Sequence, residues 1–163
     1  MKQIIFIVLL GSSLFSCSST DQNMEKESLD IVRKYMHAVE SNNLSVMDSL
    51  LADDYKGFGP SINDSTTKKE ALANWKYNAE NLYKSVVYSE YQNISLHVGE
   101  GQMAKSGYWV SDWAKVTIHF KDGTGPVNTW VNAVYRINNG KIEYSRSFYN
   151  ELDILEQLGY GLQ

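Results

Sequence analysis

Few side chains in this sequence have both the type and the neighbours that proton-transfer chemistry requires. A histidine that acts as a general acid or base must reach a substrate in a pocket. His37, His97 and His119 each lie opposite the apolar residues of their own element, so we expect all three at the solvated surface. Asp112 precedes Trp113 in an aromatic stretch; we expect it at a solvent-facing bend, and a bulge that turns it inward is the alternative.

Metal, phosphate and nucleophile chemistry find no support in the residue pattern. No set of His, Cys, Asp and Glu residues has the spacing of a metal site. No glycine-rich loop has a phosphate-binding pattern, and no serine has a suitable histidine partner. Lysines and arginines form no basic cluster, which argues against a nucleic-acid partner. We therefore expect no metal, no cofactor and no nucleic acid.

Aromatic side chains are the stronger signal, because the chain has 11 Tyr and 4 Trp against 5 Phe. Tyrosine and tryptophan combine apolar area with a polar tip, which suits a ligand with rings and hydroxyl groups. Tyr35 and Trp75 fall on the apolar faces of two expected helices. Trp109 and Trp113 are four residues apart and so share one face of an expected strand. Core packing explains the same pattern, and both interpretations stay open.

The chain has the length and composition of one globular domain. It has 163 residues, of which 43% are hydrophobic and 21% charged, and its net charge is −4. The helical period predicts three helices, of which the third opens with the capping box Thr67-x-x-Glu70; they cover about 25–40, 44–51 and 67–82. The alternation of apolar and polar residues predicts strands over 55–58, 86–98, 102–121, 127–137 and 141–149. Asn150 begins a last helix that ends at Gly159. Helices first and a strand meander afterwards predict an α+β fold.

The N-terminus carries the most specific motif. Residues 4–10 are an unbroken apolar run after a positive start, and Leu14-Phe15-Ser16-Cys17 resembles a bacterial lipobox. The run is shorter than the roughly 20 residues that span a bilayer, which is typical of a cleaved signal peptide. The resemblance implies cleavage before Cys17, the only cysteine, and a lipid on its sulfur.

These features predict the organisation and the location of the chain. We expect a signal peptide over 1–16, a lipidated tether over 17–24 and a domain over 25–163. The lipid would anchor the domain to a membrane of the cell envelope, on its periplasmic or surface side.

The element order and several motifs resemble the NTF2-like superfamily, in particular its SnoaL-like polyketide cyclase and ketosteroid isomerase-like members. The motifs are Lys34-Tyr35, Leu50-Leu51-Ala52-Asp53-Asp54, Gly59-Pro60, Asn139-Gly140-Lys141-Ile142, and the terminal helix from Asn150 to Gln157-Leu158-Gly159. The resemblance covers 25–159 and implies a cone. In this cone a strongly bent antiparallel sheet wraps on three N-terminal helices, with a short C-terminal helix and a pocket at the open end.

The positions that carry catalysis in those relatives hold other residues here. The isomerase-like members place a general-base Asp directly before the proline, where this chain has Gly59. The cyclases place an Asp where it has Ser147. Tyr35 matches the tyrosine that holds the oxyanion, but the position of its partner Asp falls near Asn132 or Ala133. The resemblance therefore implies a pocket without the usual acids.

The register implied by the resemblance assigns side chains to the two faces of the sheet. The expected ligand-pocket residues are Tyr35, Tyr55, Trp75, Trp109, Asp112, Trp113, Tyr135, Ser145, Ser147 and Tyr149. The outer face of the last strands would carry Trp130, Val134, Arg136, Tyr144, Arg146 and Phe148. Large apolar patches usually mark interfaces, so we expect a homodimer through this face.

Three functions follow from these expectations. The leading one is a non-catalytic binding or accessory domain for a small hydrophobic or aromatic ligand. The alternative is an isomerase, cyclase or dehydratase that uses Tyr35 and an acid such as Asp112. The third is an interaction domain whose sheet binds another protein. A deep cavity with an acid within reach of Tyr35 favours an enzyme, an aromatic cavity without one favours binding, and a filled cone favours a scaffold.

Lipid attachment at Cys17 gives the first testable prediction. The Cys17→Ala variant should lose labelling by a fatty-acid probe and should either leave the membrane fraction or accumulate as precursor, because its sulfur is the expected attachment atom. Fractionation with mass spectrometry of the mature N-terminus measures this. A wild-type protein that carries no lipid and is soluble without detergent would contradict it.

Overall fold

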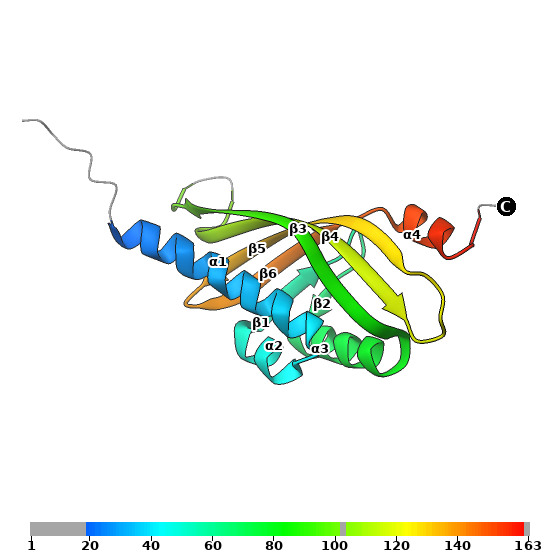
Figure 1. Ribbon diagram of the computed structural model, residues 1–163. Helices are drawn as coiled ribbons and strands as arrows, with labels where there is room; N and C mark the ends of the chain where they lie inside the picture. The colour runs from blue at the N-terminus through cyan, green and yellow to red at the C-terminus, as the bar shows by residue number, and fades with distance from the viewer. Residues whose placement is uncertain (1–18, 102–103, 162–163) are drawn as a thin grey trace, which may run out of the picture.

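The computed structural model describes residues 19–101 and 104–161 of the chain (Figure 1). The expected signal peptide and Cys17 lie outside these residues, so both stay predictions. Within the described ranges, no helix has the length and apolar character that crossing a membrane would need.

Three helices precede the main strands, as the periodicity predicts. They are α1 (Ser19–Glu40), α2 (Leu44–Leu50) and α3 (Lys68–Tyr77), and α3 continues into the π-helical segment η1 (Asn78–Leu82). The Asn43 side chain caps α2, and Thr67 and Glu70 form the predicted capping box of α3. α1 begins at Ser19, so residues 19–24 of the expected tether are helical; there the Tyr108 hydroxyl donates to Asp21 over 3.4 Å.

The apolar stripe of α1 forms the centre of the core. Val32 is fully buried, and Tyr35, Met36 and Val39 are almost so. α1 runs diagonally across the sheet in Figure 1, and the strands that it contacts most are β3 and β4. The helix therefore fills one part of the concave side of the sheet.

The sheet has six strands in the order β2-β1-β6-β5-β4-β3. The strands are β1 (Leu51–Phe58), β2 (Thr66–Thr67), β3 (Tyr83–Val98), β4 (Gly107–Phe120), β5 (Val127–Asn138) and β6 (Lys141–Phe148). The α+β prediction is confirmed, but the sheet is mixed, because β1 runs parallel to β6. A long connection through α3 and four strands joins β1 to β6, whereas a direct hairpin would have made them antiparallel.

β3 changes face halfway along its length. Its pairing with β4 shifts between Ser89 and Gln92, where Glu90 has φ +51 and one extra residue is accommodated. Such a bulge reverses the face of every later side chain. The alternation of apolar and polar residues predicts Ile94 and Leu96 on the inner face of the sheet, but their side chains are 54% and 47% exposed.

The last helix, α4 (Glu151–Gln157), lies at the end of the molecule away from the start of α1 (Figure 1). Asn150 caps it by accepting from the Asp153 backbone N–H. The Gln157 amide bonds both backbone groups of Asn128, accepting over 2.9 Å and donating over 2.8 Å. These two bonds hold α4 against the start of β5.

Gly57 of β1 provides a test of this packing. A Cβ atom at this position would lie 2.5 Å from the Tyr55 hydroxyl oxygen and 2.8 Å from Oγ1 of Thr66. Gly57→Ala should therefore lower the free energy of unfolding by about 1–3 kcal/mol through overpacking. Gly99→Ala is the matched control, since a Cβ there meets no atom within 4 Å. Urea denaturation that finds the two variants equally stable would contradict the close approach.

Candidate functional site

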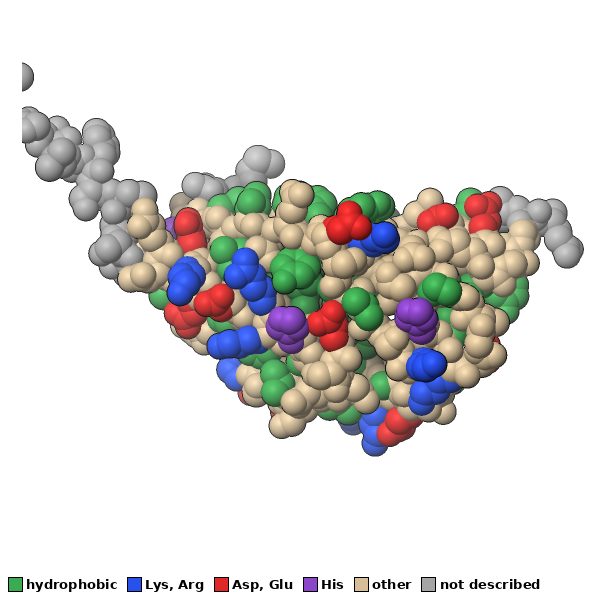
Figure 2. All heavy atoms as spheres, in the orientation of Figure 1, with side chains coloured by type: hydrophobic (Ala, Val, Ile, Leu, Met, Phe, Trp, Pro, Cys, Tyr) green, Lys and Arg blue, Asp and Glu red, His purple; other side chains and the backbone are tan. Residues whose placement is uncertain are grey.

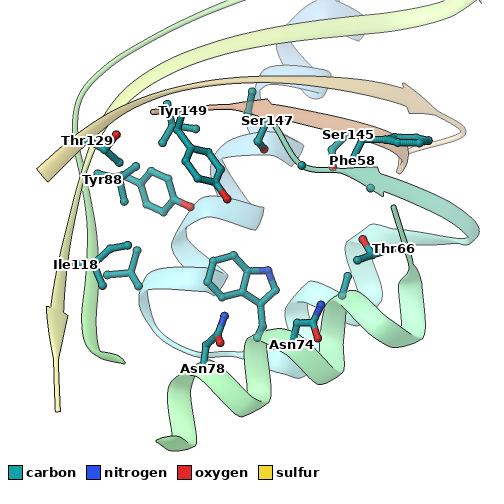
Figure 3. Close-up of a pocket in the computed structure, with 18 of the residues that line it drawn as sticks. Phe58, Thr66, Asn74, Asn78, Tyr88, Ile118, Thr129, Ser145, Ser147 and Tyr149 are labelled. Atoms are coloured by element: carbon teal, nitrogen blue, oxygen red, sulfur yellow. The ribbon is translucent and has the colours of Figure 1, made fainter. Parts of the chain in front are cut away.

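A cavity of about 660 Å³ lies between the inner face of the sheet and helices α1 and α3 (Figure 3). This volume is typical of a small-molecule site. Among the residues that line the cavity, the exposed fraction is 3% for Asp112 and 5% for Tyr55 but 46% for Leu155 of α4. The cavity therefore has a deep end beneath the sheet and a mouth beside α4.

Eight of the ten side chains expected in the pocket line this cavity. They are Tyr35, Tyr55, Trp75, Asp112, Tyr135, Ser145, Ser147 and Tyr149. In Figure 3 the hydroxyl groups of Tyr149 and Ser147 point inward from the end of β6. Gly59, the residue before the proline, also borders the cavity but brings no side chain to it.

Trp109 and Trp113 do not line the cavity, contrary to the prediction. Strand β4 alternates strictly, and its inward residues are Val110, Asp112 and Ala114, each no more than 3% exposed. The two tryptophans therefore lie on the outer face. There the Trp109 ring packs 5.6 Å from Tyr144, and Trp113 is 43% exposed.

Several polar lining residues were missed by the sequence analysis. Tyr88 of β3 points its hydroxyl into the cavity in Figure 3, next to Thr129 of β5. Asn74 and Asn78 reach it from α3 and η1. The sequence contains a signal for each of these residues. Tyr88 is two residues from buried Val86 and so shares its strand face, and the two asparagines are four residues apart on one helix face.

Two hydrogen bonds fix aromatic side chains of the deep end. The Trp75 indole N–H donates to the Tyr35 hydroxyl over 3.3 Å, and the hydroxyls of Tyr55 and Ser145 are 2.6 Å apart. The Tyr35 and Tyr135 rings meet edge to face, with centroids 6.3 Å apart. Burial raises the pKa of Tyr35, and that of Tyr135 as well. These phenols therefore stay protonated at neutral pH.

Asp112 points inward and is only 3% exposed, so the expected solvent-facing bend is wrong. Its partner across the β3–β4 ladder is Asn93, which follows the bulge. Burial raises the pKa of the Asp112 carboxyl from its usual 3.8 to about 6, and the Asn93 amide and the Arg33 guanidinium offset only part of this effect. Oδ1 of Asp112 and Nδ2 of Asn93 are buried without a hydrogen-bond partner among the described residues.

The cavity lining carries negative charge alone. Its ionisable acids are Asp112 at the deep end and Glu151 at the mouth, and no lysine, arginine or histidine of the described ranges lines it. Arg33 belongs to the exposed side of α1, where it pairs with Asp30 over 3.8 Å. Asp112 therefore has no cationic partner in the described structure.

Among the described residues, no histidine lines this cavity. All three histidines, His37, His97 and His119, are exposed, and Figure 2 shows histidines on a surface where acidic and basic side chains are interspersed. Among residues 19–101 and 104–161, no three His, Cys, Asp or Glu side chains are grouped as metal ligands would be.

The buried carboxyl predicts a specific pH dependence of stability. The pKa of Asp112 is higher in the folded state than in the unfolded state, so between about pH 4 and 6 the folded state binds more protons at this group. The free energy of unfolding therefore decreases as the pH rises through that window. Asp112→Asn should therefore gain about 1–3 kcal/mol of stability relative to wild type between pH 4 and pH 7. Denaturation of both proteins across this range measures the difference. A difference that stays constant with pH would contradict the burial of the charge.

Comparison with known proteins identifies the fold. No family model and no curated protein matches the sequence. A ketosteroid isomerase-like protein from Catenulispora acidiphila, solved with trimethylamine, has a TM-score of 0.62 at 16% identity over 80% of this chain and 93% of its own. IdmH of Streptomyces antibioticus, a candidate polyketide cyclase, has a TM-score of 0.60 at 17% identity over 82% and 99%. An NTF2-like protein of unknown function from Burkholderia pseudomallei has a TM-score of 0.61 at 13% identity over 81% and 97%. The chain therefore has the NTF2-like, ketosteroid isomerase-like fold.

Proposed function

We propose that the chain is an envelope-anchored lipoprotein whose cone binds a small organic molecule without transforming it. The observation that carries this proposal is the cavity of about 660 Å³, because tyrosine, tryptophan and serine side chains line it with both apolar faces and hydroxyl groups. The trimethylamine bound to the Catenulispora protein supports the capacity of this fold to hold a small molecule.

The position of the one deep acid favours binding over the isomerase scheme. Burial and then the Asp112 charge raise the pKa of Tyr88, whereas burial and then Tyr55 raise the pKa of Tyr35. Tyr35 already accepts a hydrogen bond from Trp75. Among the described residues no hydrogen bond joins Asp112 to Tyr35, the pair on which the expected catalysis depended.

A second candidate function is proton transfer on the bound molecule. Asp112 favours it, because a carboxyl group with a pKa near 6 can both accept and donate a proton close to neutral pH. Isomerase, cyclase and dehydratase reactions on a small ring compound all need such a group.

Binding and turnover in the same variants separate these functions. Tyr88→Phe removes one hydroxyl that points into the cavity, so for a bound ring compound with an acceptor we expect several-fold weaker affinity and unchanged stability. Tyr91→Phe is the matched control, since Tyr91 is 46% exposed and outside the lining. A panel of ring compounds is screened by calorimetry, and the mixtures are assayed for product by mass spectrometry. If wild type forms a product and Asp112→Asn forms it about 100-fold more slowly, the function is catalysis and not binding alone.

The outer face of the sheet suits a second copy of this chain. Exposed apolar side chains on three adjacent strands form this patch, namely Ile94, Leu96, Trp113 and Trp130. Trp113 pairs with Asn132 and Trp130 with Lys115, so the two indoles are diagonal neighbours across β4 and β5. A two-fold axis would bury the same patch on both copies.

The dimer has its own test. Trp130→Glu should convert a dimer to a monomer, because it introduces charge where the side chain is 60% exposed on the patch. Tyr77→Glu is the control, since Tyr77 is 58% exposed on α3, away from the sheet. Sedimentation velocity gives the masses. A monomeric wild type at high concentration would overturn the assembly.

A further inference from the structure

The deep end of the cavity has a negative charge and aromatic faces, and the described residues that line it include no counter-ion. We propose that its ligand is an organic cation, whose ammonium group lies against the Asp112 carboxylate and the rings of Tyr88 and Tyr135. This inference rests on the proposed binding function and names the chemical class of its ligand.

The first argument is the unpaired carboxylate. An ionised group removed from water is costly unless a charge or hydrogen bonds compensate it. Asp112 is 3% exposed, and its Oδ1 has no partner among the described residues. The nearest guanidinium that influences it, that of Arg33, lies on the exposed side of α1 and is bound to Asp30 and to the Asn93 side chain. A cationic ligand would supply the missing partner from the cavity side.

The second argument is the aromatic wall. Six tyrosines and Trp75 line the cavity, and a cation within about 6 Å of such rings is attracted to their faces. Burial keeps the tyrosine hydroxyls protonated, so their oxygens can accept N–H bonds without adding charge. Because no lysine, arginine or histidine of the described ranges lines the cavity, nothing there repels a positive ligand.

The third argument comes from the neighbours of Asp112. Asn93 Nδ2 and Ser95 Oγ, which follow the bulge in β3, are also buried without partners among the described residues. A water molecule could satisfy these donors, but it would bring no charge to the carboxylate. A neutral ligand would likewise leave the charge uncompensated. A cationic ligand supplies the carboxylate with an opposite charge, which neither water nor a neutral ligand brings.

An isosteric pair of probes isolates the charge. Phenyltrimethylammonium and tert-butylbenzene have nearly the same shape and differ in the positive charge. We expect wild type to bind the cation at least about 10-fold more tightly than the neutral probe, as measured by calorimetry and by tryptophan fluorescence at low salt. Asp112→Asn should lose this preference and keep its affinity for tert-butylbenzene. Glu151→Gln, at the exposed mouth, is the control and should change the preference by less.

The pH dependence of wild type gives a second measurement that needs no variant. Affinity for phenyltrimethylammonium should fall as the pH is lowered through about 6, where Asp112 takes up a proton, while affinity for tert-butylbenzene stays constant. Equal affinity for the two probes, with no effect of Asp112→Asn, would overturn the cation inference and leave the binding function standing. Failure of both probes and of the ring-compound panel would overturn the binding function as well.

Discussion

One extra residue in β3 decides which side chains meet inside the cone. Between Ser89 and Gln92 the strand gains a position relative to β4, at the point where Glu90 adopts φ +51. Before it, Val86 and Tyr88 face inward; after it, Asn93 is paired with Asp112 on the inner face. Without this bulge the register that pairs Ser89 with Lys115 would continue and would place Gln92 opposite Asp112, with Ile94 and Leu96 on the inner face.

The same bulge distributes apolar surface between the two faces of the sheet. Ile94 and Leu96 join Trp113 and Trp130 on the outer face, where each of the four side chains is between 43% and 60% exposed. Inside, α1 covers one part of the concave surface and leaves a cavity of about 660 Å³ beside α3 and α4. The bent sheet thus has a cavity on its inner side and an exposed apolar patch on its outer side.

The sequence predicted the elements and most of the pocket but not the face of every strand. The capping box of Thr67 and Glu70 and the Asn139-Gly140 turn are local signals. The structure contains both the helix that follows the capping box, α3, and the two strands that flank the turn, β5 and β6. Tyr35 and Trp75 followed from helical spacing, which no distant contact alters. Trp109 and Trp113 were assigned to the wrong face, and Asp112 to solvent, because strand parity depends on pairing with β3 and β5. The parallel β1–β6 pair also depends on contacts far apart in sequence.

The account depends most on a buried, uncompensated carboxyl group at Asp112. An NMR titration of the Asp112 side-chain carboxyl carbon, assigned by comparison with Asp112→Asn, measures this group directly. The account predicts a midpoint of about 6 in the unliganded domain. A midpoint near the usual 3.8 would contradict it, because such a group would be solvated or already paired.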